Sequence, residues 1–168
     1  HFQKTFHAML AAPITVVDIV LGDMLYGILK SVLFGSIVLL VVTLLGQIKS
    51  PQALIIPLLL VLHGAVFAVM AMCYTSVTTN IEYLNYYITL GILPFFLFGG
   101  LYFPVSALPD WLQIVIWINP LYHSVEIFRA LALGQASADI FPHIAVLFIM
   151  AAVLLPIPIK LMNKRLIS

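Results

Sequence analysis

Charged residues are scarce in this sequence. Only 8% of its 168 residues are Asp, Glu, Lys or Arg, whereas 64% are hydrophobic, and the mean hydropathy is +1.19. A soluble domain is typically about 25% charged and about 45–50% apolar. A water-soluble fold of this length could not hide so much apolar surface, because small domains leave much of their surface exposed. The composition excludes a soluble domain, a disordered chain and a disulfide-rich miniprotein, and it predicts an integral membrane protein.

Cysteine and recognisable catalytic motifs are nearly absent as well. Cys73 is the single thiol, so no intrachain disulfide can form, and we expect it to act as a small buried hydrophobic residue. Residues 22–31, GDMLYGILKS, resemble a Walker motif, but the lysine comes two residues too late and no strand precedes it. The net charge of +1 gives no reason to expect nucleic acid as a partner. We therefore expect no enzyme activity and no cofactor bound by this chain.

Long apolar runs are what the sequence has instead. A helix needs about 20 mainly apolar residues to cross a bilayer. These runs do not alternate between apolar and polar residues, as membrane β-strands would. The pattern predicts an all-α, polytopic membrane protein with four transmembrane helices, at about residues 24–45, 53–77, 83–103 and 140–159.

The positions of Lys and Arg predict the orientation in the membrane. Four spans place both ends of the chain on one side. That side would hold five cations, Lys4, Lys30, Lys160, Lys164 and Arg165, whereas the other would hold Lys49 and Arg129. Because cytoplasmic loops carry the excess of positive charge, we expect both ends to be cytoplasmic.

Several local signals refine the spans. Thr15 and Asp18 have the spacing of a capping box, so the first helix should begin near Val16. Small residues recur every four positions in that helix and should let a neighbouring helix pack closely, which we favour over a binding site. These are Gly27, Ser31 and Gly35. Three prolines lie within spans and are expected to kink them, namely Pro57, Pro94 and Pro156.

The segment between the third and fourth spans is too apolar for an ordinary loop. Residues 108–118 are too short to cross the bilayer and predict an interfacial or re-entrant helix that begins after Pro109. A second short helix should have Asn119 as its N-cap, Pro120 as its first residue and Gly134 as its end. We interpret residues 104–134 as an outer re-entrant segment that plugs or lines something.

Three polar residues of the second short helix follow one another at three-residue steps. His123, Glu126 and Arg129 could form a polar contact site or gate near the outer leaflet. The simpler interpretation, which we favour, is an intrahelical Glu–Arg pair worth about 0.2–0.5 kcal/mol when exposed. A metal site on His123 and Glu126 is disfavoured, since no further ligands cluster nearby in the sequence. His63, inside the second span, is expected to be a hydrogen-bonded packing residue.

Two stretches together resemble the permease subunit of ABC-2-type exporters, most closely the nodulation-type lipo-oligosaccharide exporter permeases. The opening stretch is KTFHAMLAAPITVVDIVLGDMLYG, and the outer one is GGLYFPVSALPDWLQIVIWINPLYHSVEIFRALALG. The pairing of P-x-x-x-L-P-x-W-L-Q with N-P-L-Y-H-x-x-E-x-x-R carries the resemblance. The residues that the outer segment contributes to it are Pro104, Pro109, Trp111, Asn119, Pro120, His123, Glu126 and Arg129.

The resemblance implies a number of spans, a set of partners and a transport mechanism. Such permeases have six spans, so this chain would be the C-terminal two-thirds of a single ABC-2-type transmembrane domain. Residues 1–14 would form a cytoplasmic coupling segment that docks into a separate ATPase subunit, which binds the ATP and Mg. Two permease copies, expected to be a homodimer, and two ATPases would work together in the bacterial inner membrane. ATP-driven closure of the ATPases would move the coupling segments and open the path outward.

The coupling segment can also be judged from its residues alone. Its apolar side chains recur at helical spacing, and polar ones occupy the other face. The docking residues are Phe2, Lys4, Phe6, His7, Met9 and Leu10. On these residues alone, an amphipathic helix that rests on lipid headgroups is as good an interpretation as a helix that docks into an ATPase. The resemblance favours docking.

The leading hypothesis is thus an exporter permease that moves an amphipathic glycolipid, polysaccharide or hydrophobic drug. The alternative is a membrane anchor or assembly subunit that recruits a soluble partner without transporting anything. An ion-coupled transporter would need paired ionisable residues near the midplane and inverted repeats, and the sequence shows neither.

Overall fold

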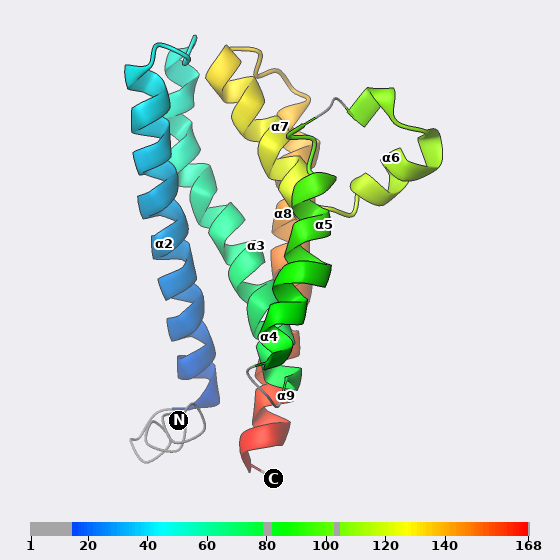
Figure 1. The fold of residues 1–168 in the computed structure, drawn as a ribbon. Helices are drawn as coiled ribbons and strands as arrows, with labels where there is room; N and C mark the ends of the chain where they lie inside the picture. Colours follow the sequence, from blue (N-terminus) through cyan, green and yellow to red (C-terminus); the bar gives the residue numbers. More distant parts are fainter. Residues whose placement is uncertain (1–14, 79–81, 103–104, 168) are drawn as a thin grey trace.

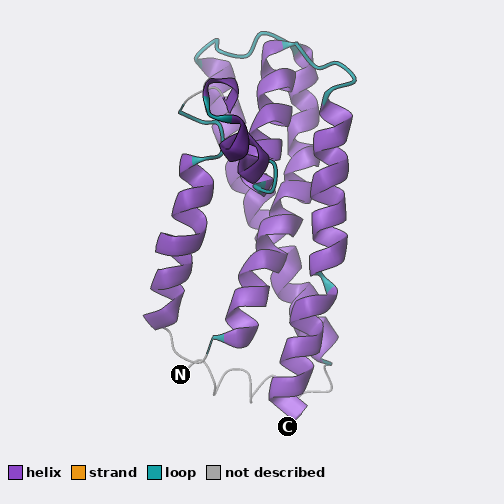
Figure 2. Cartoon of the chain, turned by 90° about the vertical axis from the view of Figure 1, so that its right-hand side faces the viewer, coloured by secondary structure: helices purple, strands orange, loops and turns teal. Residues whose placement is uncertain are grey.

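The structure is a computed structural model, and it describes residues 15–78, 82–102 and 105–167. Within these residues the chain is helical and contains no strand (Figures 1 and 2). This confirms the all-α prediction. The α-helices are α2 (Val16–Leu44), α3 (Ile56–Val77), α4 (Glu82–Tyr86), α5 (Leu93–Leu97), α6 (Asp110–Ile116), α7 (Pro120–Leu133), α8 (Ile140–Leu154) and α9 (Pro156–Ile167). Short 3-10 turns span Pro51–Ile55 and Val105–Ala107, and a π-helical segment, Tyr87–Ile92, joins α4 to α5.

The helices run up and down between two ends of the molecule. The start of α2 and the end of α9 lie at the same end, and the turn after α2 and the end of α7 lie at the opposite one (Figure 1). The loop after α2 is joined to the last turn of α7 by a hydrogen bond from the Lys49 amide to the Ala132 carbonyl, at 2.9 Å. We refer to the two ends as the terminal end and the loop end.

Three helical stretches are long and apolar enough to cross a membrane. They are Val16–Leu44, Pro51–Val77 and Ile140–Lys164, and they correspond to three of the four predicted spans. The predicted span 83–103 corresponds to the continuous helix formed by α4, the π segment and α5, which ends at Leu97. Sixteen residues of helix reach about 24 Å, less than the roughly 30 Å of a hydrocarbon core. The predicted count of four spans is therefore not confirmed.

The helix at 82–97 ends early because of the glycines that follow it. Gly100 adopts a φ of +73°, a left-handed conformation that L side chains rarely take. Because the chain turns there, residues 98–102 form turns and bends and cannot extend the helix.

The start of α2 confirms the capping box. The Asp18 amide donates to Thr15 Oγ1 at 3.3 Å, and the Thr15 amide donates to Asp18 Oδ2 at 2.8 Å. Two orphan donors of the first turn are thereby satisfied, so the helix begins at Val16, well before the apolar span predicted from residue 24.

The small-residue stripe of α2 packs within the chain, as expected. A Cβ added at Gly27 would lie 2.9 Å from Ala68 Cβ, and one added at Gly35 would overlap the end of the Leu60 side chain. Between them, the Ser31 hydroxyl donates to the Leu60 carbonyl at 3.0 Å. Glycine at these sites lets α2 and α3 approach closely, and the stripe is a helix-packing surface.

The prolines differ in what they do. Pro156 is the first residue of α9 and follows the break after α8, so an interruption occurs where a kink was predicted. Pro94 lies in the first turn of α5, directly after the π-helical segment. Pro57 lies in the first turn of α3, where its missing N–H costs no helical hydrogen bond. Pro57 lies inside the apolar stretch Pro51–Val77, next to the change from 3-10 to α-helix, and the kink expected there stays a prediction.

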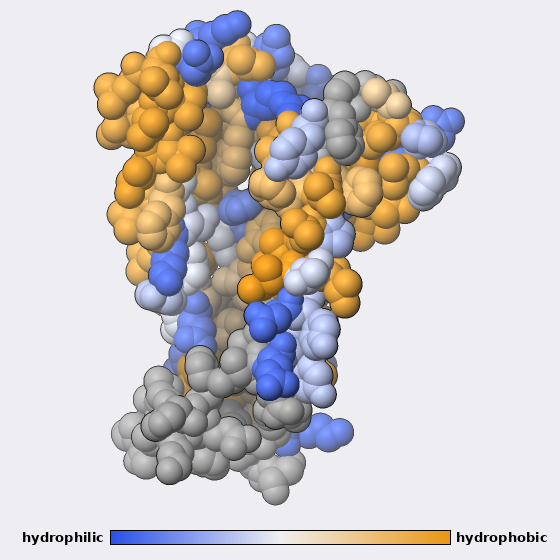
Figure 3. Space-filling view, viewed as in Figure 1, coloured by the Kyte–Doolittle hydropathy of each residue, from blue (hydrophilic) through white to orange (hydrophobic). Residues whose placement is uncertain are grey.

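The core lies around α3, which packs against α2, α7, α8 and α9. Its main cluster joins α3 to α7 and α8 and contains Ala53, Ile56, Leu60, Val66, Ile127, Leu131 and Leu147. Outside this core, large apolar side chains are exposed along the helices; Leu58 is 71% exposed and Leu29 67%. The apolar surface is visible over much of the face shown in Figure 3. Such a surface fits lipid surroundings, not water.

Candidate functional site: a histidine network between α3, α7 and α8

The two short helices of the outer segment form where the sequence predicts them. Helix α6 follows Pro109 and begins at Asp110, and α7 begins at Pro120 and ends before Gly134. Gly134 has a φ of +73°, and a Cβ there would lie 2.9 Å from Ser50 Cβ. Glycine is therefore required at this position both by the turn and by the close approach of the neighbouring loop.

Asn119 fixes the start of α7 inside the molecule. Its Oδ1 accepts a hydrogen bond from the Leu121 amide at 3.0 Å, the expected N-cap contact. Its Nδ2 donates to the Phe95 carbonyl at 2.8 Å, and only 3% of the residue is exposed. Because Phe95 belongs to α5, one side chain both caps α7 and fastens it to the neighbouring helix.

His123 lies one turn further along α7 and is completely buried. Its Nε2 lies 2.8 Å from the Trp117 carbonyl, and its Nδ1 lies 2.7 Å from His143 Nδ1 on α8. A carbonyl only accepts, so Nε2 must carry the hydrogen of a neutral His123 ring. Its Nδ1 is then an acceptor, and His143 donates to it from Nδ1–H; these tautomers are assigned from the hydrogen-bond partners.

Burial favours the neutral form of His123, which lies outside the three candidate spans. Loss of hydration lowers the pKa of His123, the hydrogen bond to the Trp117 carbonyl raises it, and the neighbouring His143 lowers it. The net direction is downward. Two charged imidazoles would place two N–H groups against each other across the 2.7 Å contact, so the paired geometry requires at least one neutral ring.

A second histidine contact joins α3 to the same part of α7. His63 Nδ1 lies 2.8 Å from Ser124 Oγ, and Ser124 donates its own hydrogen to the Pro120 carbonyl at 3.1 Å. Since the hydroxyl hydrogen is used in that bond, His63 donates to the Ser124 oxygen. The prediction that His63 is a hydrogen-bonded packing residue is confirmed.

Aromatic rings enclose the histidine pair. The Trp117 ring stacks on His143 at 5.8 Å between centroids and meets His123 edge-on at 5.2 Å. Tyr122 contacts both imidazoles, at 5.4 and 5.7 Å. Such pairs contribute about 0.5–1.5 kcal/mol each beyond the burial of their area. The rings hold both imidazoles in place on two different helices.

Glu126 and Arg129 lie at the outer edge of α7. Arg129 donates to Glu126 Oε1 at 2.7 Å, which confirms the intrahelical pair. The same guanidinium donates to the Gly100 carbonyl at 2.6 Å. The pair is partly exposed and contributes little by itself, but the second bond fastens the chain after α5 to α7.

The structure separates the predicted site residues into three groups. Pro120, His123, Glu126 and Arg129 lie on α7, and Asn119 is its N-cap. Pro109 is the N-cap of α6, and Trp111 lies on α6, where it is 67% exposed and takes no part in the network. The remaining ones lie outside the described residues, namely Phe2, Lys4, Phe6, His7, Met9 and Leu10 of the coupling segment, and Pro104 of the outer segment.

Sequence reasoning missed His143 and Ser124 as partners. Ser124 neighbours His123 in the chain, and its place on the buried face of α7 is the signal that could have identified it. His143 could not be matched to His123 by counting from the loop between α7 and α8. That loop descends along α7 before α8 begins (Figure 1). His123, far from the end of α7, therefore meets His143, which lies near the start of α8. Three or more His, Cys, Asp or Glu side chains able to hold a metal do not gather anywhere in the described part of the chain.

The network can join three helices through polar contacts in an otherwise apolar bundle. Each contact would leave a buried polar atom unpaired if the helices separated, at a cost of about 1–3 kcal/mol per atom. The arrangement therefore resists independent movement of α7 relative to α3 and α8.

Comparison with known proteins identifies a family and several relatives. The family model described as ABC-2 type transporter matches residues 1–133. Curated relatives include nodulation protein J of Rhizobium meliloti, 34% identical over 98% of this chain, and nodulation protein J of Sinorhizobium fredii, 32% identical over 99%. A probable multidrug ABC transporter permease of Escherichia coli is 26% identical over 82% of this chain and 38% of its own length.

These matches cover only part of each relative. The chain spans 63% of the length of the two nodulation proteins. No solved structure matches the chain. A family match over residues 1–133, together with apolar helices of membrane-spanning length, shows that the chain belongs to the ABC-2 type transporter family of multi-pass membrane permeases.

Proposed function

We propose that the chain is the C-terminal part of the permease subunit of an ATP-driven exporter. The substrate class is amphipathic, such as a lipo-oligosaccharide, a polysaccharide or a hydrophobic drug. The observation that carries the proposal is the family match over residues 1–133, supported by relatives named nodulation protein J and probable multidrug ABC transporter permease. The membrane is the bacterial inner membrane, with the terminal end of the bundle in the cytoplasm.

The energy would come from a partner. The family implies an ABC ATPase subunit in general, and we assign the ATP and Mg to that subunit. Residues 1–14 would dock into it as the coupling segment, through Phe6 and Met9 among others. A second copy of the permease would complete the path.

The outer segment would close the path at the loop end. Helix α7 lies within the bundle, whereas α6 projects from its side (Figure 1). Asn119 at the start of α7 is buried against Phe95 of α5. A helix that begins beside α5 and is fastened to α3 and α8 by histidines fits a re-entrant plug that moves as one body with these helices.

The docking proposal can be tested directly. In the full-length subunit, expressed with its ATPase, we expect Phe6→Asp combined with Met9→Asp to abolish ATP-dependent uptake of a fluorescent amphipathic probe by inside-out vesicles. The ATPase should also no longer co-purify with the subunit. Each charge would have to enter an apolar groove, which costs several kcal/mol without a partner.

A matched control separates docking from folding. Gln3 is expected on the polar face of the same helix, so Gln3→Asp should leave both uptake and co-purification unchanged. Undiminished ATPase recovery with the double variant would contradict the docking. Failure of the wild-type subunit to move any amphipathic probe, with its ATPase bound and active, would favour the assembly-subunit alternative.

A further inference from the structure

The two imidazoles of the His123–His143 pair differ in their access to solvent. His123 is completely buried and uses both of its nitrogens, Nε2 toward the Trp117 carbonyl and Nδ1 toward His143. His143 is only partly buried. In the described part of the chain its Nε2 has no hydrogen-bond partner, and it is not a buried atom. A proton that arrives from solution therefore reaches Nε2 of His143 first.

A first added proton leaves the hydrogen bond of the pair in place. A neutral His143 donates from Nδ1 and has its lone pair on Nε2, so the proton adds to Nε2 without disturbing the contact between the Nδ1 atoms. The donor is then a charged imidazolium, and a hydrogen bond from a charged donor is stronger than one from a neutral donor. One added proton thus strengthens the link between α7 and α8.

The surroundings of His143 accept this positive charge. His143 lies in the first turn of α8, where the helix N-terminus opposes a cation. Two carboxylates offset that effect, since Glu126 and Asp139 both attract a charge on His143. Asp139 is exposed, and Glu126 is shared with Arg129. Tyr122 touches both rings, and burial raises the pKa of its phenol, so this side chain stays neutral.

A second added proton does not fit the same geometry. It must add to Nδ1 of His123, because Nε2 already carries a hydrogen toward the Trp117 carbonyl. Two N–H donors would then face each other at 2.7 Å with no acceptor between them, and both rings, 4.9 Å apart between centroids, would be positively charged. Burial is the main cause that lowers the pKa of His123, so this second charge is added only in acid.

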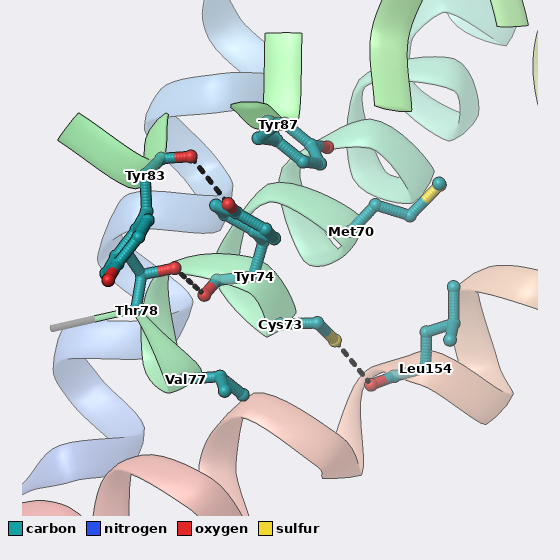
Figure 4. Close-up of a pocket in the computed structure, with 8 residues that line it drawn as sticks. All are labelled: Met70, Cys73, Tyr74, Val77, Thr78, Tyr83, Tyr87 and Leu154. Atoms are coloured by element: carbon teal, nitrogen blue, oxygen red, sulfur yellow. Dashed lines mark hydrogen bonds between the residues drawn. The ribbon is translucent and has the colours of Figure 1, made fainter. Parts of the chain in front are cut away.

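The other elements packed around α7 bring few further titratable groups among the described residues. Helix α8 contains one, which belongs to the pair, whereas α5 and the 3-10 turn before α3 contain none. Asp110 lies at the far end of α6 from Trp117. Helix α3 contributes His63, which is hydrogen-bonded to another residue of α7. Cys73 and Tyr74 of α3 line a groove near the terminal end (Figure 4), about 15 Å further along that helix.

We propose that the His123–His143 pair is a pH-sensitive switch, which holds the start of α7 to α8 with no or one added proton and opens when both imidazoles are charged. The part that moves is the first turn of α7 together with Trp117, because Ile127 and Leu131 anchor the rest of α7 in the apolar core. The opening itself does not depend on transport. That the switch responds to acid outside the cell rests on the proposed function, in which the loop end faces outward.

The order of the two protonation steps can be observed by nuclear magnetic resonance. The full-length subunit with isotope-labelled histidine is placed in lipid vesicles, in buffers that contain EDTA so that no metal ion bridges the rings. At pH 7.5 we expect the hydrogen of His123 on Nε2 and that of His143 on Nδ1. As the pH falls to 5.0, His143 should become charged before His123. The variants His123→Gln and His143→Gln assign the signals, and a charge that appears first on His123 would overturn the proposal.

The opening is measured by amide hydrogen exchange in the same vesicles. Exchange of residues 120–124 is divided by exchange of residues 64–72 of α3, so that the intrinsic effect of pH on exchange cancels. Opening takes up one proton, so its equilibrium constant rises by up to about tenfold per pH unit below the ordinary histidine pKa of about 6.5. Between pH 6.5 and 5.5 we expect the ratio to rise about three- to tenfold. An unchanged ratio in the folded wild type would overturn the proposal.

Two variants separate a switch from a buried histidine that only titrates. In His143→Gln the side-chain amide can donate to a neutral His123 and, after a flip, accept from a charged one. His123 still titrates there, but the exchange ratio should change less than about twofold. His63→Gln is the matched control, because it alters the other histidine contact of α7 and leaves the pair intact. It should keep the wild-type rise. The same rise in His143→Gln as in the wild type would overturn the proposal. Neither measurement needs transport, so the switch and the proposed function can fail separately.

Discussion

His123 of α7 and His143 of α8 share a hydrogen bond between their Nδ1 atoms, at 2.7 Å. This bond is a polar link between the buried face of α7 and α8, which also pack through the apolar core. Together with the contact between His63 and Ser124, it fastens α7 on two sides. Helix α7 is therefore an integral part of the bundle, held by identifiable polar contacts as well as by the apolar core.

The first prediction concerns His123. Replacing His123 with Ala leaves His143 Nδ1 and the Trp117 carbonyl without their partner and creates a cavity between α7 and α8. We expect a loss of about 2–4 kcal/mol in the free energy of unfolding. Thermal unfolding of the purified subunit in detergent, followed by tryptophan fluorescence, measures it. Trp111→Phe at an exposed site should change the melting temperature little, and an equal change in both variants would contradict the role of His123.

The second prediction concerns pH. Burial lowers the pKa of His123, so the unfolded chain binds more protons than the folded one between that lowered pKa and the ordinary value of about 6.5. The free energy of unfolding should then be largest above pH 6.5 and fall as the pH drops below it. His123→Gln removes this titration. The melting temperature between pH 7.5 and 5.5 should fall more for the wild type than for His123→Gln, and parallel curves would refute the prediction.

Much of the fold could be predicted because local signals act over a few residues. Thr15 and Asp18 set the start of α2, and Asn119, Pro120 and Gly134 set both ends of α7, through contacts within one turn. The length of the predicted third span could not be judged from its apolar residues alone. The turn at the left-handed Gly100 ends the helix, although the apolar residues continue beyond it. The hydropathy of a segment does not reveal such a backbone turn.

The site was only partly predictable for a different reason. Glu126 and Arg129 are one turn apart on one helix, so their pairing follows from spacing. The partner of His123 comes from a separate helix, and the meeting point depends on how far the intervening loop descends before α8 begins. Contacts between helices therefore could not be predicted from a single sequence.

The third prediction concerns Arg129. Its guanidinium joins Glu126 to the Gly100 carbonyl, and the loss of the second bond frees the chain between α5 and α6. We expect Arg129→Gln to accelerate amide hydrogen exchange in residues 98–102 by about three- to tenfold, which corresponds to a bond of about 0.7–1.4 kcal/mol. Glu126→Gln keeps the bond to Gly100 and serves as the control. Equal exchange in both variants would show that the Gly100 contact does not hold this segment.

The fourth prediction concerns the contact of α2 with α3. A Cβ at Gly64 would lie 2.7 Å from Ser31 Cβ and 2.9 Å from the Ile28 Cα, so the backbone of α2 would have to move. A Cβ at Gly22 of α2 would meet no heavy atom within 4 Å in the described part of the chain. Both substitutions to Ala gain about 1 kcal/mol of helix propensity, but only Gly64→Ala adds about 1–3 kcal/mol of strain.

Gly64→Ala should therefore unfold at a lower temperature than Gly22→Ala, by several degrees. The melting temperature of each variant in the same detergent measures the difference. Because the propensity gain is common to both, the difference isolates the closeness of α2 to α3. If the two variants unfolded at the same temperature, Gly64 would not be required for the approach of these helices, and the stripe of Gly27, Ser31 and Gly35 would need another explanation.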